Sequence, residues 1–277
     1  MKSITERLQT NAVDVSRPMR ASWKGYLRLG DLMMPVRLYS ATRSISPRFV
    51  QLHAEDHEPI RRVTLCSRDG EQLTEGDIVR AVEYAGVYVE IDDDELERNS
   101  PLERDIVIRQ ITEPGDIDSI YYDNPYYVIP DAGGELAYAI VRRAFEKTRK
   151  NAVATFLFYG RERLALISCQ DGMIHLHTLR FHEEIVPKNE VPIPALPQPS
   201  PSQIAVASQL LERYAMPFHA SDYRDQQADV LNEFIERKAK GLPPKKLARI
   251  SSSATPENEV MAKMRQMLGE DPRALRS

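Results

Sequence analysis

Cysteine is scarce in this sequence, and long apolar runs are missing. The two cysteines, Cys66 and Cys169, lie far apart, so we expect no disulfide framework and a reducing environment. No stretch approaches the roughly 18 consecutive apolar residues that a membrane span requires, and residues 1–20 lack the apolar run of a signal peptide. We therefore expect a cytoplasmic protein without a membrane partner.

The common signatures of catalysis are also missing. There is no Walker loop, no Rossmann glycine fingerprint, no Gly-x-Ser-x-Gly elbow and no His-Glu-x-x-His motif. The stretch from Asp131 to Gly134 places two glycines before a predicted helix, but one glycine pair is ordinary turn chemistry. The sequence therefore predicts a protein that is not an enzyme and needs no cofactor.

One pair of histidines keeps a metal-dependent enzyme open as an alternative. His175 and His177 alternate with Leu176, so both side chains project from one face of a predicted strand. Two imidazoles at this spacing can chelate zinc or iron, but a working site needs three or four ligands and groups that orient them. No third ligand stands in register, which favours a polar strand face over a metal site.

The net charge of −4 hides an uneven distribution. Residues 1–50 carry nine Lys or Arg against three Asp or Glu, residues 51–130 carry seven against twenty, and residues 131–180 carry eight against five. Attraction to phosphates depends on the local field, which decays over about 8 Å at physiological salt. A distant acidic face therefore need not cancel a basic groove, although the same pattern also fits ordinary solvated surface.

The residue pattern divides the chain into five segments. Residues 1–19 read as a polar extension, 20–186 as a β-rich core, 187–201 as a proline-rich connector with six prolines in fifteen positions, 202–250 as a helical arm, and 251–277 as a short tail. The spacing of the strands within the core favours a barrel or sandwich over a doubly wound sheet. The expected fold class is α+β, mainly β.

Periodicity predicts nine strands and three longer helices, besides a few short ones. The strands are expected at 23–29, 34–39, 60–66, 78–84, 87–91, 106–112, 152–159, 163–169 and 173–181, and the helices at 133–150, 203–214 and 223–240. In the first helix, Leu136, Ile140 and Ala144 form one apolar row beside a second row of Val141 and Phe145, which predicts a buried stripe. Ser202 is expected to cap the second helix.

Six stretches resemble the prokaryotic Ku family, in that family's order and spacing over about residues 19–250. They are Met19–Gly30 (MRASWKGYLRLG), Pro35–Ala41 (PVRLYSA), Phe49–Ala54 (FVQLHA), Ile120–Pro130 (IYYDNPYYVIP), Arg161–Ile167 (RERLALI) and Met216–Gln226 (MPFHASDYRDQ). The chain departs from many relatives in three respects: it lacks a Cys-x-x-Cys motif near the position of Cys66, it lacks a long lysine-rich tail, and its overall charge is more acidic.

The resemblance implies a fold and a function. It implies a β-barrel core whose arm closes a ring with the arm of a second subunit, giving a homodimer that threads onto ends of double-stranded DNA without reading sequence. It further implies a role in non-homologous end joining, in which the helical segment after Pro201 helps to recruit the ATP-dependent DNA ligase D. A protein-only interaction module, acting through the connector and helices, stays open as a further alternative.

The candidate phosphate contacts are chosen by charge and not by the resemblance. They are Lys24, Arg37, Arg43, Arg48, Arg61, Arg62, Lys147, Arg149, Lys150, Arg161 and Arg163. Some of them are expected to serve the structure instead, because Arg37 lies within a predicted strand and Arg161 and Arg163 flank another.

Overall fold

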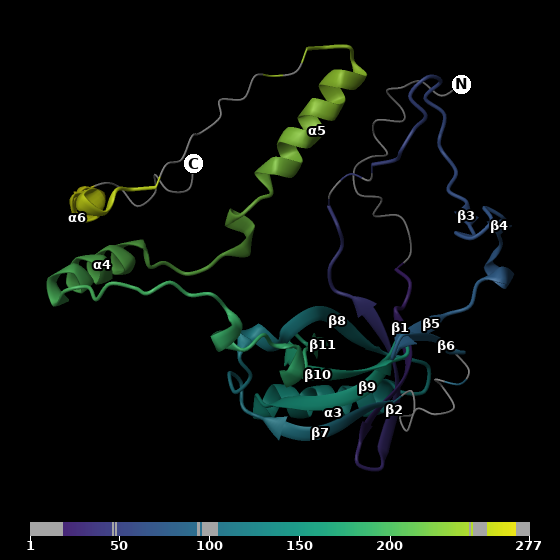
Figure 1. Ribbon diagram of the computed structural model, residues 1–277. Coiled ribbons are helices and arrows are strands. Elements are labelled where there is room, and N and C mark those ends of the chain that lie inside the picture. Colours follow the sequence, from purple (N-terminus) through teal and green to yellow (C-terminus); the bar gives the residue numbers. More distant parts are fainter. Residues whose placement is uncertain are drawn as a thin grey trace. The chain divides into compact units, whose positions relative to one another are not determined.

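The computed structural model describes residues 19–45, 47, 49–92, 95, 105–243, 245 and 254–269. The chain divides after Glu190 into two compact units. Figure 1 shows a strand-rich first unit and a second unit in which the regular structure is helical. The fold is α+β and mainly β, as the sequence predicts.

A closed barrel of seven strands forms the centre of the first unit (Figure 1). In spatial order the strands are β1 (Trp23–Leu29), β2 (Leu32–Ser40), β8 (Tyr122–Pro130), β11 (Met173–Leu179), β10 (Arg161–Gln170), β9 (Asn151–Phe158) and β7 (Asp105–Thr112). The parallel pair β1 and β7, with Tyr26 opposite Asp105, closes the ring of strands. Closure satisfies the edge hydrogen bonds that an open sheet would expose.

Alternating residues of the strands fill the barrel. On β9, for example, the buried positions are Ala152, Ala154, Phe156 and Phe158, with the intervening positions half-buried. Complete burial of one large aliphatic side chain contributes about 1.5–3 kcal/mol, and Leu27 and Ile106 are among the fully buried residues. The strand β8 was not predicted, because its Asp-Asn-Pro sequence resembles a turn and hides the period of two.

The helix α3 (Glu135–Thr148) packs at one end of the barrel. It joins the end of β8 to the start of β9, and its Val141 and Phe145 belong to the barrel core. The other predicted row is exposed: Leu136 keeps 76% and Ile140 60% of its accessible surface. The prediction that both rows are buried is wrong because α3 meets the barrel along one narrow line.

A segment that we call the arm, described from Ala41 to Asp92, leaves the barrel at the end opposite α3. We call this end of the barrel the arm root. The strands β1 and β7 begin at this end and β2 finishes there, because Trp23 pairs with Leu38 and Tyr26 with Asp105. Among the described residues between Ala41 and Asp92, the strands form two small hairpins, β3 (Thr64–Leu65) with β4 (Gln72–Leu73) and β5 (Ala81–Tyr84) with β6 (Val87–Glu90), and a short 3-10 helix lies between them at Glu75–Asp77. The strand predicted at 60–66 is thus much shorter, and nearly every described arm residue is exposed.

The second unit contains α4 (Pro201–Tyr214), α5 (Gln226–Ala239) and α6 (Val260–Gly269), of which α4 and α6 contact each other. Ser200, and not Ser202, caps α4: its hydroxyl accepts from the backbone of Gln203, and the Gln203 side chain accepts from the backbone of Ser200. The helix begins earlier than predicted because Pro201 occupies the first helical position, where its missing N–H costs nothing. Among the described helices, none has both the length and the apolar character needed to cross a membrane.

Candidate nucleic-acid interface

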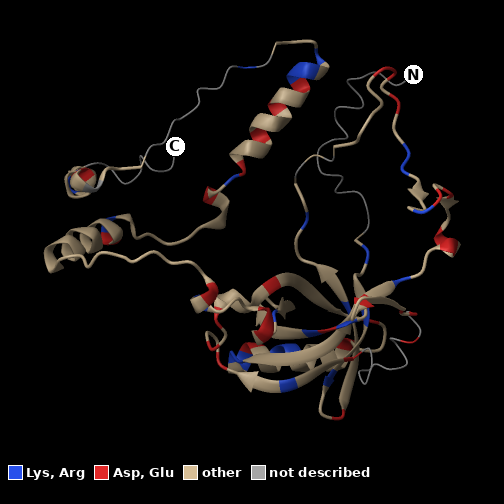
Figure 2. Ribbon diagram, in the orientation of Figure 1, with Lys and Arg blue, Asp and Glu red and all other residues tan. Residues whose placement is uncertain are grey.

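The candidate cations do not form one patch. Figure 2 shows Lys and Arg, in blue, spread over the barrel and the arm. Ten of the eleven are described, while Arg48 lies outside the described residues. They fall into four groups: Lys24 and Arg37 on β1 and β2; Arg43, Arg61 and Arg62 in the arm; Lys147, Arg149 and Lys150 at the end of α3; and Arg161 and Arg163 on β10.

The first group is held by one acid. The Lys24 ammonium lies 2.9 Å from Oδ2 of Asp131, and the Arg37 guanidinium donates to Oδ1. The Asp131 side chain is 8% exposed and also accepts from the backbone N–H of Ala132. The hydrogen bonds from Arg37, Lys24 and Ala132 hold the pKa of Asp131 far below its usual value, so the carboxylate stays ionised and offsets one of the two positive charges.

The α3 group lies at the far end of the barrel from the arm. Arg149 ends the helix in a left-handed conformation with φ +56°, and Lys150 pairs with Glu113. The strand β9 starts at Asn151 and runs for eight residues before the turn that leads to Arg161. At about 3.3 Å per residue this strand separates the two groups by roughly 23 Å, so one phosphate cannot bridge them.

The β10 group lies at the arm root. The Trp23 indole, at the start of β1, donates to the carbonyl of Leu157 at 3.1 Å, which places the turn between β9 and β10 beside the strands that lead to the arm. Arg161 is exposed and Arg163 half-buried. Within the described structure neither guanidinium forms an ion pair, so both remain available to an anion.

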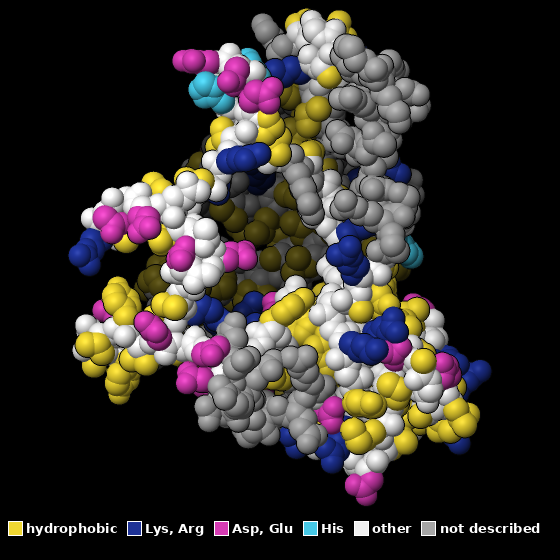
Figure 3. Space-filling view, turned by 90° about the vertical axis from the view of Figure 1, so that its right-hand side faces the viewer, with side chains coloured by type: hydrophobic (Ala, Val, Ile, Leu, Met, Phe, Trp, Pro, Cys, Tyr) yellow, Lys and Arg dark blue, Asp and Glu magenta, His cyan; other side chains and the backbone are white. Residues whose placement is uncertain are grey.

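The arm combines its cations with many acids. Arg43 and Arg61 are exposed, and Arg62 donates to the Gln51 side chain at 2.8 Å. Figure 3 shows acidic side chains, in magenta, gathered with histidines at the top of the arm. Asp56 accepts from the backbone N–H of Glu58, which lowers the pKa of Asp56. Hydrogen bonds from the hydroxyl and, to a smaller extent, the backbone N–H of Thr74 lower the pKa of Asp77. These acids stabilise turns, which accounts for part of the acidic block at residues 51–130.

The histidine pair is arranged for ring packing. His175 meets the Tyr127 ring edge-on at 5.3 Å between centroids, and His177 meets Tyr122 at 5.5 Å. Burial, followed by the nearby His175, lowers the pKa of His177, which favours the neutral ring. No group of three metal-ligating side chains occurs among the described residues. The arrangement does not favour the metal-dependent alternative.

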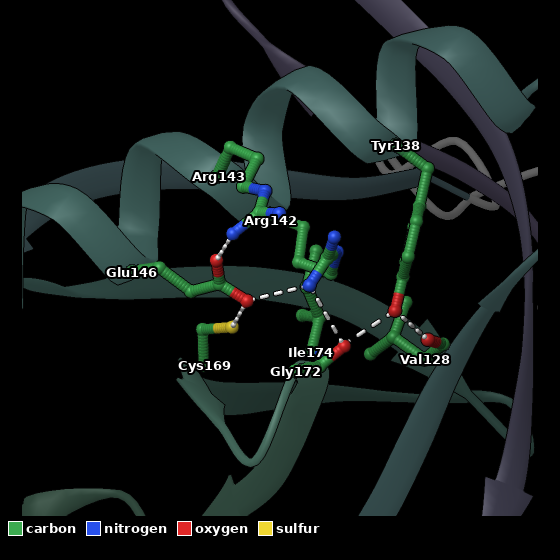
Figure 4. Close-up of polar contacts among 8 residues, drawn as sticks. All are labelled: Val128, Tyr138, Arg142, Arg143, Glu146, Cys169, Gly172 and Ile174. Carbon is green, nitrogen blue, oxygen red and sulfur yellow. Dashed lines mark hydrogen bonds and ion pairs between the residues drawn. The ribbon is translucent and has the colours of Figure 1, made fainter.

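Cys169 belongs to a polar network between α3 and the hairpin of β10 and β11 (Figure 4). Arg142 donates to Glu146 and to the carbonyl of Gly172 at 3.2 Å. The Cys169 thiol lies 4.0 Å from the same Glu146 carboxylate. Burial, with the negative charge of Glu146, raises the pKa of this thiol, which opposes formation of the nucleophilic thiolate. The network therefore joins the helix to the barrel and is poorly suited to catalysis.

Sequence reasoning missed the residues that organise these groups. It treated Lys24 and Arg37 as separate candidates, although they stand opposite each other on paired strands. It gave Asp131 only a turn role, although the resemblance includes the adjoining stretch that ends at Pro130. It also gave no role to Tyr159, which it placed only as the last residue of the strand predicted at 152–159.

Comparison with known proteins agrees with this architecture. Residues 28–206 match the family described as the Ku70/Ku80 beta-barrel domain. The chain is 33% identical over 221 residues to "Non-homologous end joining protein Ku" of Koribacter versatilis, covering 79% of this chain and 76% of that protein. Proteins of the same name from Archaeoglobus fulgidus and Mycobacterium tuberculosis are 32% and 30% identical, over 80% of this chain in each case and 89% and 84% of the relatives. The chain therefore belongs to the Ku family.

Proposed function

We propose that the chain binds ends of double-stranded DNA without reading their sequence, as a ring-shaped homodimer that acts in non-homologous end joining. In this role it protects and bridges ends and has no catalytic activity or cofactor of its own. The names of the relatives support the process, and the resemblance noted in the sequence supports the ring. The exposed apolar surface of the arm is the observation that carries the proposal.

The arm has too little structure to be stable in isolation. Each of its two hairpins has two strands, and among the described residues no further layer covers them. An isolated hairpin is marginal in water. Apolar side chains are nevertheless frequent along it: Phe49 is 79%, Tyr84 74% and Tyr88 78% exposed. Apolar surface of this extent marks an interaction site. A second copy of the same arm, related by a two-fold axis, offers a matching apolar surface.

The positions of the cations support a choice of those that would face DNA in such a ring. Arg161 and Arg163 lie at the arm root, and Arg43, Arg61 and Arg62 lie along the arm. We assign the main phosphate contacts to these five. The α3 group lies at the opposite end of the barrel, and Lys24 and Arg37 already share Asp131, so both groups contribute less in this assignment.

The helical unit is the proposed site for the ATP-dependent DNA ligase D. Along α5 a groove is lined by the apolar side chains of Val230, Leu231 and Phe234, together with Gln227, Glu233, Arg237 and Lys245. An isolated helix of 14 residues is marginal in water, so a protein partner that covers this apolar face would stabilise it. For this repair role the protein would act in the cytoplasm, in association with the nucleoid.

DNA topology provides the decisive experiment. We expect tight binding to a linear duplex, little binding to a covalently closed circle of the same sequence, and affinity that falls steeply with salt because bound counterions are released. The double variant R161Q/R163Q is expected to lower the slope of log affinity against log salt by about two. The matched variant K147Q/R149Q should leave it nearly unchanged.

The outcomes separate the candidate functions. Equal affinity for linear and closed DNA would exclude encirclement. Absence of any DNA binding would favour the protein-only module. A stoichiometric metal ion that is lost in His175→Ala would favour the metal-dependent enzyme.

A further inference from the structure

We propose that Tyr159 is a stacking platform for the unpaired bases of a DNA overhang, and that Arg161 and Arg163 bind phosphates of the same strand. This inference rests on the proposed function, because it adds a means of distinguishing one kind of DNA end from another. It concerns the tip of the hairpin between β9 and β10.

The backbone at Tyr159 adopts a conformation that tyrosine rarely takes. Tyr159 has φ +51° and Gly160 φ +73°, as in a type I′ turn, whose first position favours Asn, Asp or Gly. A bulky residue in the left-handed region is strained, and such strain is concentrated at functional sites. The side chain is also 79% exposed. Packing in the core therefore does not explain why a tyrosine occupies this position.

Other aromatic side chains pack against the ring of Tyr159. The ring centroids of Tyr159 and Phe158 are 4.4 Å apart, and Phe158 contacts Tyr126 at 5.4 Å and Phe156 at 5.5 Å. Phe156 in turn contacts Trp23 at the start of β1. This row of rings connects Tyr159 to the barrel core, which limits its motion while most of its surface stays open.

Two cations follow within four residues. Arg161 stands opposite Phe158 and Arg163 opposite Phe156, so both arginines share a strand face with the supporting rings. Neither guanidinium has an ion-pair partner within the described structure. An open aromatic ring beside uncommitted arginines is the combination with which proteins bind single-stranded nucleic acid, the ring stacking on bases and the cations following the backbone.

The chemistry favours an overhang over the interior of a duplex. Base pairs inside a duplex have both faces covered by their neighbours, whereas unpaired bases offer a free face. Stacking of one base on an aromatic side chain is worth a factor of about 5 to 150 in affinity. At the arm root, where we expect the duplex to pass, Tyr159 would meet such a base only at an end.

Fluorescence of 2-aminopurine tests this inference, because stacking quenches it. The probe is placed in a four-nucleotide overhang of one duplex and within the paired region of another. We expect the wild-type homodimer to quench the overhang probe and to prefer the overhang duplex over a blunt one by about 5-fold to 150-fold. Tyr159→Phe should keep both properties.

The variant Tyr159→Asn removes the ring while suiting the turn, so it is expected to fold. It should lose the quenching and the overhang preference and retain its affinity for blunt duplex. Unchanged quenching and preference in Tyr159→Asn would overturn the inference and leave the proposed function intact. Failure of the wild type to bind linear duplex in preference to closed circles would overturn both.

Discussion

The Lys24 ammonium lies 2.9 Å from the carboxylate of Asp131, so a residue at the start of the α3 connection fastens the first strand of the barrel. Arg37, which stands opposite Lys24 on β2, donates to the same carboxylate. One acid thereby connects β1, β2 and the segment after β8. The backbone adds a further link, because Asp131 donates its N–H to the carbonyl of Pro35 at 2.9 Å.

We expect Asp131→Asn to lower the free energy of unfolding at pH 7, because two cations lose their shared partner. The folded pKa of Asp131 is depressed, so its stabilising contribution is complete above the ordinary pKa of about 4 and is lost as the pH falls through the folded value. Urea unfolding of both proteins should therefore show a constant difference from pH 7 to about pH 5 that shrinks at lower pH. A difference that stays constant down to pH 2 would contradict this account of the carboxylate.

The strands of the barrel are readable in the sequence where one face is buried and the other is not. The predicted ranges 23–29 and 106–112 correspond closely to β1 and β7. In the first range apolar residues alternate with others, and the second begins with the β-branched run Ile106–Ile108. Helix α3 shows the limit of this signal. Its two apolar rows are equally apolar in sequence, and contacts with residues distant in the chain decide which row faces the barrel. One such contact is the close approach of Gly134 to Pro35, where an added Cβ would lie 2.7 Å from the Pro35 carbonyl oxygen.

The site was harder to predict than the fold. Charge alone selects Lys147 and Arg161 equally, yet β9 places them at opposite ends of the barrel. Pairing between residues distant in sequence decides which cations are already bound by an acid, as Lys150 is by Glu113. A local pattern cannot contain this information. The strain at Tyr159 was hidden for a similar reason, because a tyrosine followed by glycine does not reveal a left-handed turn.

The Tyr138 hydroxyl connects two strands to the helix. It donates to the carbonyl of Val128 at 2.8 Å and accepts from the backbone N–H of Ile174 at 3.2 Å (Figure 4). Tyr138→Phe leaves both backbone groups without this partner, so we expect the free energy of unfolding to fall by about 1–3 kcal/mol. Chemical denaturation of the wild type and the variant measures this difference in the free energy of unfolding. Tyr121→Phe is the control: its hydroxyl contacts His182 at the surface, and a change within about 0.5 kcal/mol is expected.

The arm hairpin of β5 and β6 offers a direct test of assembly. Val82 and Val89 stand opposite each other and are 55% and 46% exposed in the single chain. If a second arm covers them, aspartate at both positions would place unpaired carboxylates in an apolar interface, where their desolvation is costly. We expect V82D/V89D to weaken dimerisation by at least about 100-fold, which sedimentation velocity over a range of concentrations measures.

The control is Leu136→Asp, an equally drastic change on the exposed face of α3 and outside the arm, which should leave the dimer intact. A V82D/V89D protein that still sediments as a dimer, or a wild type that sediments as a monomer, would refute assembly through this hairpin.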